Sequence, residues 1–302
     1  MKKFLFIILS LVFMLTACSN NSDQKHDKDM KTYKLESGKT IKVPKHPKRV
    51  AVMNAFYVGD FIKLGIKPVA VPEFTKNSSV LAPYLKDTKL VGDNDVEQVL
   101  KAKPDLIIAD SSDKNMKKYE KIAPTVSYTY TKYNYKSILK EIGKLVGEEK
   151  KASTWIDKWD KTTQNDKTEI KQKVGNSTAS VFELYAKQIY IFQKNWGRGL
   201  DIVHDAFGMP MTKTYKQKID SNKAGYDTIS SEDISNYAGD YIFLSKSSNS
   251  KTSIEISNLW DNLKAVKQHH VITYKAEDYQ FTDPITLDAL RKKLKSEILE
   301  KP

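Results

Sequence analysis

The chain has 302 residues, with 50 lysines and arginines against 37 aspartates and glutamates, which gives a formal net charge of +13 at pH 7. Its single cysteine excludes an intramolecular disulfide and metal sites built from several cysteines. A hydrophobic content of 40% excludes a globally disordered chain, and the length predicts two domains or lobes. The positive charge leaves nucleic acid, an anionic surface and an acidic ligand open as partners.

The N-terminal residues predict export followed by lipid anchoring. A short positive start precedes an apolar run from Phe4 to Met14 that is too short to span a bilayer, so residues 1–17 are interpreted as a signal peptide. Cys18 ends this pattern as in a bacterial lipobox, where it would carry acyl chains; a secretory signal with a chance cysteine is the alternative. Residues 18–31 are almost wholly polar and predict a flexible tether. The folded protein is therefore expected outside the cell, away from nucleic acid.

The chain alternates short apolar segments with short helical ones, which is typical of an α/β fold with parallel sheets. In the first half, strands are predicted over 49–53, 67–71, 90–92, 105–109 and 125–128, and helices over 60–64 and 96–101. In the second half, strands are predicted over 179–184, 240–244 and 270–274, and helices over 199–207, 259–265 and 286–299. We therefore predict an N-terminal lobe over 32–146 and a C-terminal lobe over 174–302.

A single long helix is predicted between the two lobes. Residues 148–173 contain no glycine or proline, and Ala152, Trp155, Ile156 and Trp159 recur at the spacing of an amphipathic helix. At 1.5 Å per residue such a helix is roughly 39 Å long. We interpret residues 147–173 as a rigid bridge, which predicts only small motion of one lobe against the other.

The two lobes share a spacing that suggests an internal repeat. Glu97 lies eight residues before Asp105, which begins a predicted strand after a turn-breaking residue. Glu232 lies eight residues before Asp240, which begins a predicted strand in the same way. Duplication of one α/β unit explains this match, and chance spacing in a charge-rich chain is the alternative.

The motifs of common enzyme classes are missing from the sequence. No GxSxG, P-loop or HExxH motif occurs, and no GxGxxG motif follows a predicted strand. Of the five histidines only His269 and His270 are adjacent, and neighbouring positions in a strand point to opposite faces, so no metal site is predicted. These features favour a binding protein over an enzyme.

The segment from Tyr190 to Gly199 contains the most distinctive basic residue. Arg198 is one of only three arginines in the chain, lies between two glycines and follows Trp196 by two positions. Its planar guanidinium is suited to bidentate contact with anionic oxygens, and the indole offers a flat apolar wall. The segment follows a strand and opens a helix, where α/β proteins bind ligands; a structural turn with a core tryptophan is the alternative.

Aromatic residues gather at the ends of other predicted strands, in both halves of the chain. They are Phe56, Tyr57, Tyr128, Tyr130, Tyr133, Tyr135, Tyr279 and Phe281. Together with one arginine they predict a cleft for a bulky, oxygen-rich and partly flat ligand. The alternating tyrosines after residue 127 fit an edge strand equally well.

These features together resemble the helix-bridged substrate-binding lipoproteins of ABC importers, over essentially the whole mature chain. The general patterns of that family are Lys45–Val52, Val99–Ile108 and Ala123–Val126. Similarity to the FhuD-like iron(III)-hydroxamate-binding lipoproteins of Gram-positive bacteria is carried by Asn195–Gly199, Ala206–Gly208, Tyr237–Ile242 and Asp283–Pro284. The resemblance implies two pseudo-repeated α/β lobes joined by one long helix, and a protein lipid-anchored to the outer face of the cytoplasmic membrane through Cys18.

The resemblance also implies roles for individual residues. Arg198 would donate to the hydroxamate oxygens that coordinate iron(III), and Tyr190 and Trp196 would line the pocket. Tyr130 would be a wall from the other lobe, with Tyr128 as the alternative in that loop.

The remaining candidate walls come from other loops and are Phe56, Tyr279 and Phe281. The FhuD-like group tends to have a tryptophan beside the tyrosine of the last loop, whereas this chain has Gln280. Because the siderophore itself holds the iron, neither metal-ligating residues nor an intrinsic cofactor are expected.

The same resemblance implies protein partners. Glu97 and Glu232 would each contact one subunit of an ABC permease dimer that works with its ATPase; solvated acids at helix starts are the alternative. The receptor itself is expected to be a monomer. A receptor for haem or for another siderophore class, and a surface lipoprotein hydrolase, remain the alternative functions.

Overall fold

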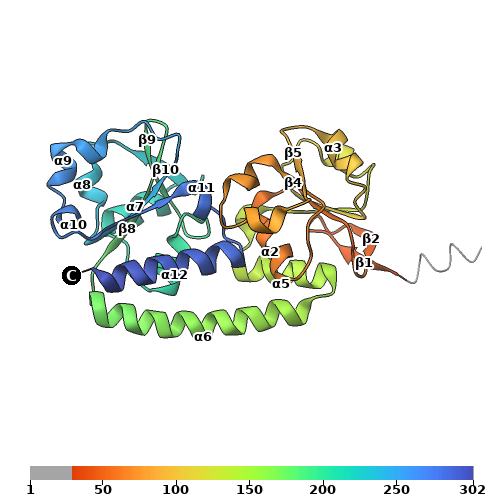
Figure 1. The fold of residues 1–302 in the computed structure, drawn as a ribbon, viewed down its shortest axis with the longest axis horizontal. Helices are drawn as coiled ribbons and strands as arrows, with labels where there is room; N and C mark the ends of the chain where they lie inside the picture. The colour runs from red at the N-terminus through yellow and green to blue at the C-terminus, as the bar shows by residue number, and fades with distance from the viewer. Residues whose placement is uncertain (1–28, 302) are drawn as a thin grey trace, which may run out of the picture.

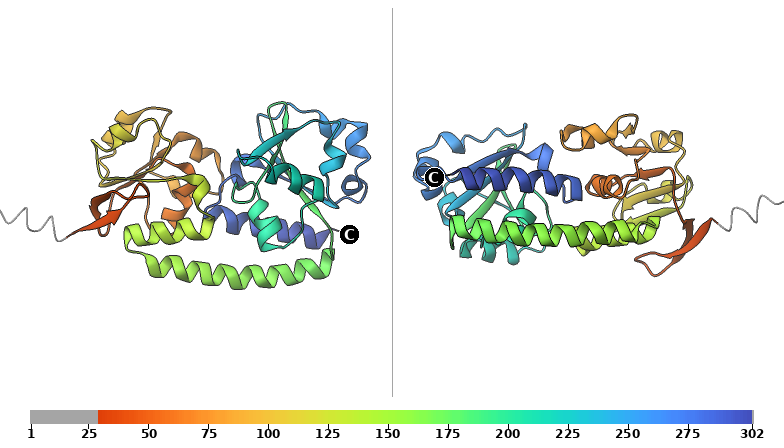
Figure 2. Two further views of the ribbon diagram at one scale, coloured as in Figure 1. Left: turned by 180° about the vertical axis from the view of Figure 1, so that it is seen from behind. Right: turned by 60° about the horizontal axis from the view of Figure 1, so that its bottom comes forward.

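The computed structural model describes residues 29–301, which form two α/β lobes lying side by side (Figure 1). Each lobe contains a five-stranded sheet. Helix α6 (Glu149–Val174) runs beneath both lobes, and α12 (Pro284–Glu300) lies alongside it in every view (Figures 1 and 2). The fold class predicted from the sequence, two α/β lobes bridged by one long helix, is confirmed.

The N-terminal sheet is entirely parallel, in the order β5-β4-β3-β6-β7. Its strands are β3 (Val50–Val52), β4 (Ala70–Pro72), β5 (Lys89–Val91), β6 (Leu106–Asp110) and β7 (Thr125–Tyr128). Its helices are α2 (Val58–Lys63), α3 (Val96–Lys101), α4 (Met116–Tyr119) and α5 (Tyr135–Val146), with 3-10 turns η1 (Ala55–Tyr57), η2 (Glu73–Asn77), η3 (Ala82–Leu85) and η4 (Tyr130–Lys132). Helices cover both faces, which explains why the central strand β3 is an unbroken apolar run.

The C-terminal sheet is mixed, in the order β10-β9-β8-β11-β12. Its strands are β8 (Ala179–Tyr185), β9 (Gln188–Phe192), β10 (Tyr226–Ile229), β11 (Tyr241–Lys246) and β12 (Val271–Lys275). Strands β8, β11 and β12 are parallel, whereas β9 is antiparallel to both β8 and β10. The expectation of a wholly parallel sheet is wrong for this lobe. Only Ala186 and Lys187 separate β8 from β9, and a connection that short can form only a hairpin.

The helices of the C-terminal lobe are short apart from α12. They are α7 (Lys213–Asp220), α8 (Ile234–Tyr237), α9 (Asn258–Asp261), α10 (Lys264–Lys267) and α11 (Ala276–Tyr279), with the 3-10 turn η6 (Ile254–Ile256). The helix predicted over 199–207 is a π-helix, η5 (Asp201–Ala206). Its wider turn is shown by the amide of Phe207, which donates to the carbonyl of Ile202 at 2.8 Å.

The internal repeat has a structural counterpart in the two lobes. Asp105 lies just before β6 and accepts hydrogen bonds from the backbone N–H groups of Lys48 and Arg49, just before β3. Asp240 lies just before β11 and accepts one from the N–H of Thr178, just before β8. Each carboxylate thus ties together the starts of two adjacent parallel strands, which gives the matching Asp spacing a physical role.

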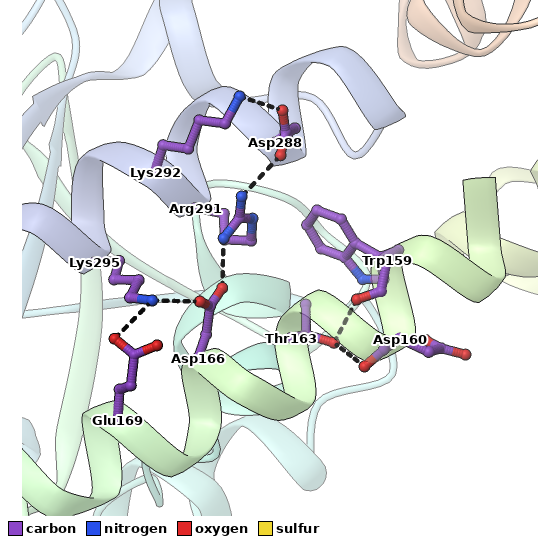
Figure 3. Close-up of polar contacts among 9 residues, drawn as sticks. All are labelled: Trp159, Asp160, Thr163, Asp166, Glu169, Asp288, Arg291, Lys292 and Lys295. Atoms are coloured by element: carbon purple, nitrogen blue, oxygen red, sulfur yellow. Dashed lines mark hydrogen bonds and ion pairs between the residues drawn. The ribbon is translucent and has the colours of Figure 1, made fainter.

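A buried ionic network fixes α12 to the bridging helix α6 (Figure 3). Asp166 of α6 is 2% exposed and accepts hydrogen bonds from Arg291 and Lys295 of α12. Arg291 also pairs with Asp288 at 3.1 Å, and Lys295 with Glu169 at 2.9 Å. The bridge and the C-terminal lobe therefore form one packed unit, in keeping with a rigid connection.

An N-terminal hairpin that the sequence did not predict precedes the first lobe. It consists of β1 (Met30–Lys34) and β2 (Thr40–Pro44), paired antiparallel. The predicted tether is therefore too long at its end, because Met30 and Lys31 belong to β1. The predicted signal peptide and Cys18 lie outside the described residues, and no helix within 29–301 is long and apolar enough to cross a membrane.

Candidate ligand-binding cleft

The main cavity has a volume of about 840 Å³. It lies mostly on the C-terminal lobe, on the side that faces the N-terminal lobe. One wall is aromatic and consists of Tyr185, Tyr190, Phe192, Trp196 and Tyr226. Another part of the lining is polar and consists of Ser247, Ser248, Asn249, Lys275, Glu277 and Gln280. Phe74 and Asn77 reach this cavity from η2 of the N-terminal lobe, so both lobes contribute to it.

A second cavity of about 510 Å³ lies on the N-terminal lobe. It is lined by Met53, Asn54, Ala55, Phe56, Phe74, Asp110, Ser111, Ser112, Thr129, Tyr130 and Thr131. These residues follow the carboxyl ends of β3, β4, β6 and β7, where parallel sheets place ligand-binding loops. Phe74 lines both cavities, which therefore adjoin and form one cleft between the lobes.

The loop from Asn195 to Gly199 has an unusual backbone that requires its two glycines. Gly197 and Gly199 have φ angles of 73° and 95°, and Arg198 between them has 55°. A Cβ atom on Gly197 would lie 2.2 Å from the carbonyl oxygen of Gln280, and one on Gly199 would lie 2.6 Å from the hydroxyl of Tyr274. Only glycine fits at either position, and the resulting sharp turn directs Arg198 to the cavity wall.

Arg198 is held in place on several sides. Its Nε donates to Glu183 at 3.1 Å, its Nη1 donates to the carbonyl of Trp196 at 2.8 Å, and its guanidinium lies 4.6 Å from the ring centre of Phe192. Its own carbonyl accepts a hydrogen bond from the hydroxyl of Tyr274. A guanidinium has five N–H donors, so these bonds leave further donors for a ligand.

Glu183 is a functional candidate that the sequence reasoning missed. It is the one charged residue of strand β8, its side chain is 9% exposed, and it also accepts a hydrogen bond from Ser245. A carboxylate in a buried strand needs a partner, and Arg198 supplies it. A single charged residue in a buried strand was the available signal.

The predicted walls Tyr190 and Trp196 lie in the aromatic wall of the main cavity. Tyr190 is part of β9 and not of a loop, and it stacks beside Phe192 with ring centres 6.0 Å apart. Trp196 also stacks with Phe192, with ring centres 6.2 Å apart. Its indole also packs on Gly225, where a Cβ atom would lie 2.3 Å from Nε1. The hairpin of β9 with β8 thus presents a continuous aromatic surface.

Tyr130 and Phe56 meet residues of the other lobe across the cleft. The hydroxyl of Tyr130 donates to the carbonyl of Asn195 at 3.0 Å, and its ring lies edge-on to Trp196 at 6.1 Å. The ring of Phe56 packs 4.5 Å from Tyr130 and 5.3 Å from Phe281. These contacts place the loop that carries Tyr130 directly against the loop that carries Arg198.

Three predicted walls, Tyr128, Tyr279 and Phe281, line neither cavity. Tyr128 is 2% exposed and its hydroxyl lies 3.0 Å from that of Tyr33, because the last residue of β7 points into the core beneath the N-terminal hairpin. Phe281 is 1% exposed, and its ring packs edge-on to Phe56. Tyr279 ends α11 and its ring packs against Tyr274. These three residues are therefore not proposed as ligand contacts.

The charges of the main cavity balance. Its charged residues are Arg198 and Lys275 against Glu183 and Glu277, so their formal charges sum to zero. Burial acts to raise the pKa of Glu277, but hydrogen bonds from Ser248 and Ser247 outweigh it and lower the pKa below its ordinary value. Glu277 is therefore ionised at neutral pH, and the cavity presents no excess of either charge.

A buried carboxylate supports the arginine loop from beneath. Asp201 is 1% exposed and accepts a hydrogen bond from the backbone N–H of Asn195 at 3.0 Å. Burial, and then the charge of nearby Asp205, raises the pKa of Asp201 to about 7. This bond ties the start of the loop to the first residue of η5.

The predicted permease contacts lie on the surface, one on each lobe. Glu97 is in the first turn of α3 and forms an ion pair with Lys101 at 2.7 Å. Glu232 is exposed just before α8. Within residues 29–301 no group of three or more histidine, cysteine, aspartate or glutamate side chains is arranged to hold a metal ion.

A cleft between two α/β lobes, with a fixed guanidinium and aromatic walls, defines a receptor for a small ligand. Residues 50–277 match the model of the periplasmic binding protein family, and the chain belongs to that family. It is 41% identical to the iron(3+)-hydroxamate-binding protein FhuD of Bacillus subtilis, over 94% of this chain and 93% of that protein.

Solved structures agree with this assignment. The FhuD protein of S. pseudintermedius superposes with a TM-score of 0.83 at 36% identity, covering 90% of this chain and 98% of that one. The structure of FhuD2 from Staphylococcus aureus with bound ferrioxamine B superposes with a TM-score of 0.80 at 40% identity, covering 84% and 99%. The relatives with which the chain aligns over nearly its full length are binding proteins.

Proposed function

We propose that this protein is an extracytoplasmic receptor that binds iron(III)-hydroxamate siderophores in the cleft and delivers them to an ABC permease. The observation that carries the proposal is Arg198, held by Glu183 and Phe192 at the wall of an aromatic cavity without net charge. Three hydroxamates, each with one negative charge, neutralise Fe(III), so the coordinated core has no net charge and presents oxygens as acceptors. Arg198 would donate to those oxygens, and the aromatic wall would cover the organic shell.

The charge balance also bears on the alternatives. A carboxylate siderophore is polyanionic and would need an excess of cations, whereas Arg198 and Lys275 are matched by two glutamates. The names of the relatives, which include a hydroxamate-binding protein and a complex with ferrioxamine B, support the same ligand class. In this proposal the protein is not an enzyme and has no intrinsic cofactor, because the iron is cargo and the siderophore holds it.

Quenching of tryptophan fluorescence tests the ligand class. Trp196 lies in the cavity wall, so ferrioxamine B and ferrichrome are expected to quench the protein saturably, while haemin and ferric citrate bind at least about tenfold more weakly. A Trp196→Phe variant is the control, since it should lose most of the quenching. Absence of a saturable response to both hydroxamates would overturn the proposal.

We further propose that Glu97 and Glu232 contact the permease dimer. Both are exposed, and each lies eight residues before the aspartate that ties two strand starts together in its lobe. Reversing both to lysine is expected to abolish siderophore uptake by cells while the purified protein binds ferrioxamine B normally. Asp157→Lys, at an exposed residue of α6, is the matched control and should leave uptake intact, since α6 and α3 lie on opposite sides of the molecule (Figure 1). Normal uptake by the double variant, or loss of its ligand binding, would contradict the assignment.

The location and the division of the chain remain proposals from the sequence. We propose a signal peptide over 1–17, lipidation of Cys18, a tether up to the start of β1, and a monomeric receptor on the outer face of a cytoplasmic membrane. The lobes would extend over 32–146 and 174–302, with the bridge between them. Cell fractionation of a Cys18→Ser variant tests the anchor, because retention in the membrane fraction would contradict it.

A further inference from the structure

The N-terminal hairpin makes its most specific contact with the loop that carries Tyr130. Glu36, between β1 and β2, accepts hydrogen bonds through Oε2 from both the backbone N–H of Thr129, at 3.2 Å, and its hydroxyl, at 2.8 Å. The side chain of Glu36 is only 16% exposed. A carboxylate that accepts two hydrogen bonds from one residue holds that residue in a defined orientation.

The hairpin also contacts the loop on the other side of Tyr130. Lys132 Nζ lies 3.9 Å from Glu36 Oε1. The ring of Tyr133 packs edge-on to Tyr128 at 5.8 Å, and Glu36 adds to burial in raising the pKa of the Tyr133 hydroxyl. Tyr33 of β1 meets the hydroxyl of Tyr128 at 3.0 Å. The hairpin therefore holds the chain both before and after Tyr130.

The loop itself has few means of fixing Tyr130. Tyr130 begins the three-residue turn η4, and Thr129 stands at the position that would cap it. The hydroxyl of Thr129 makes no capping bond there; it donates to Glu36 and lies 2.9 Å from the hydroxyl of Ser111. A 3-10 turn of this length has poor hydrogen-bond geometry of its own, so its placement depends on outside contacts.

Tyr130 is the residue whose placement affects the cleft. Its ring separates Phe56 from Trp196, and its hydroxyl reaches the carbonyl of Asn195 in the loop that presents Arg198. A shift of the turn would move the aromatic wall and release this bond between the lobes. Glu36, in contrast, is not among the residues that line either cavity.

We propose that Glu36 is a positioning residue for ligand binding, which acts from outside the cleft by holding Thr129 and so orienting Tyr130. The inference rests on the proposed function, and it adds the hairpin to the elements that determine affinity. It also gives the first folded segment after the predicted anchor a role in the binding site.

The test compares ferrioxamine B affinities of purified variants. Glu36→Ala is expected to weaken binding by about 5- to 20-fold, because hydrogen bonds to a charged group are lost. Glu36→Gln keeps an acceptor oxygen for Thr129 and should stay within about threefold of the unaltered protein. Glu120→Ala, at an exposed glutamate of the same lobe, is the matched control and should have no effect. If the unaltered protein fails to bind ferrioxamine B, the proposed function fails and not this inference.

A double-mutant cycle separates positioning from general stabilisation. In a Tyr130→Ala background, Glu36→Ala should weaken binding by less than about twofold, since the residue through which it acts is gone. An undiminished effect in that background would overturn the inference, as would wild-type affinity of the folded single variant. Should Glu36→Ala not fold, Tyr33→Phe removes the neighbouring hairpin contact and should weaken binding about two- to fourfold, again only when Tyr130 is present.

Discussion

Replacing Arg198 with alanine is expected to weaken binding of ferrioxamine B by at least about 100-fold, because each hydrogen bond from a charged donor contributes about 1.5 to 3 kcal/mol. The guanidinium lines the main cavity, and Glu183 and Phe192 hold it in a fixed orientation. Arg198→Lys should be intermediate, since an ammonium keeps the charge but loses the planar fork. Titration of tryptophan fluorescence with ferrioxamine B measures the affinity of the unaltered protein and of both variants.

The Arg198 prediction needs a control for stability, because the substitution leaves Glu183 buried without its partner. Combining Arg198→Ala with Glu183→Gln should restore much of the lost thermal stability, yet binding should stay as weak as in the single variant. Arg49→Ala, which removes an arginine on the far side of the N-terminal sheet from the cleft, should leave affinity unchanged. Recovery of binding in the double variant would show that Arg198 only stabilises the fold.

Replacing Asp166 with alanine is expected to lower the free energy of unfolding by about 3 kcal/mol, the largest stability effect that we predict. Asp166 is 2% exposed and receives hydrogen bonds from both Arg291 and Lys295 (Figure 3). Its removal leaves the guanidinium of Arg291 buried between α6 and α12, with Asp288, 39% exposed, as its remaining ionic partner within residues 29–301. Urea unfolding monitored by circular dichroism measures the change.

Glu169→Ala is the matched control for Asp166, because Glu169 lies on the same helix and pairs with the same Lys295. Its side chain is 48% exposed, so water screens the pair and its loss should cost less than about 1 kcal/mol. Equal effects of the two substitutions would contradict the view that the buried network fixes the bridge. A large lobe rotation between free and ligand-bound structures would contradict the rigid connection itself.

Local patterns predicted much of the fold. The bridging helix was predictable because a long segment without glycine or proline carries apolar residues at helical spacing, and α6 buries Trp155, Ile156 and Trp159 on that face. The parallel strands of the N-terminal lobe were predictable because a strand buried on both faces must be an apolar run, as Leu106–Asp110 nearly is.

Other elements depend on partners that lie far away in the sequence. Strand β9 was not predicted, because only its pairing with β8 and β10 makes these residues a strand. The strands β1 and β2 contain many polar residues, because one face of their hairpin is exposed, so they lack an apolar run. The contacts of the hairpin with Tyr128 and Thr129 are therefore invisible to local patterns.

Some properties of the candidate site were likewise predictable from local sequence, and others were not. Composition and spacing alone determined that Arg198 is distinctive, since an arginine between two glycines in a lysine-rich chain is a local property, and they determined two lobes with a bridge. Only the tertiary structure decided that Tyr130 faces the cleft while Tyr128 is core, that Glu183 holds Arg198, and that the charges of the cavity balance. Those properties depend on which side chains meet across strands and lobes, and distance along the chain does not encode them.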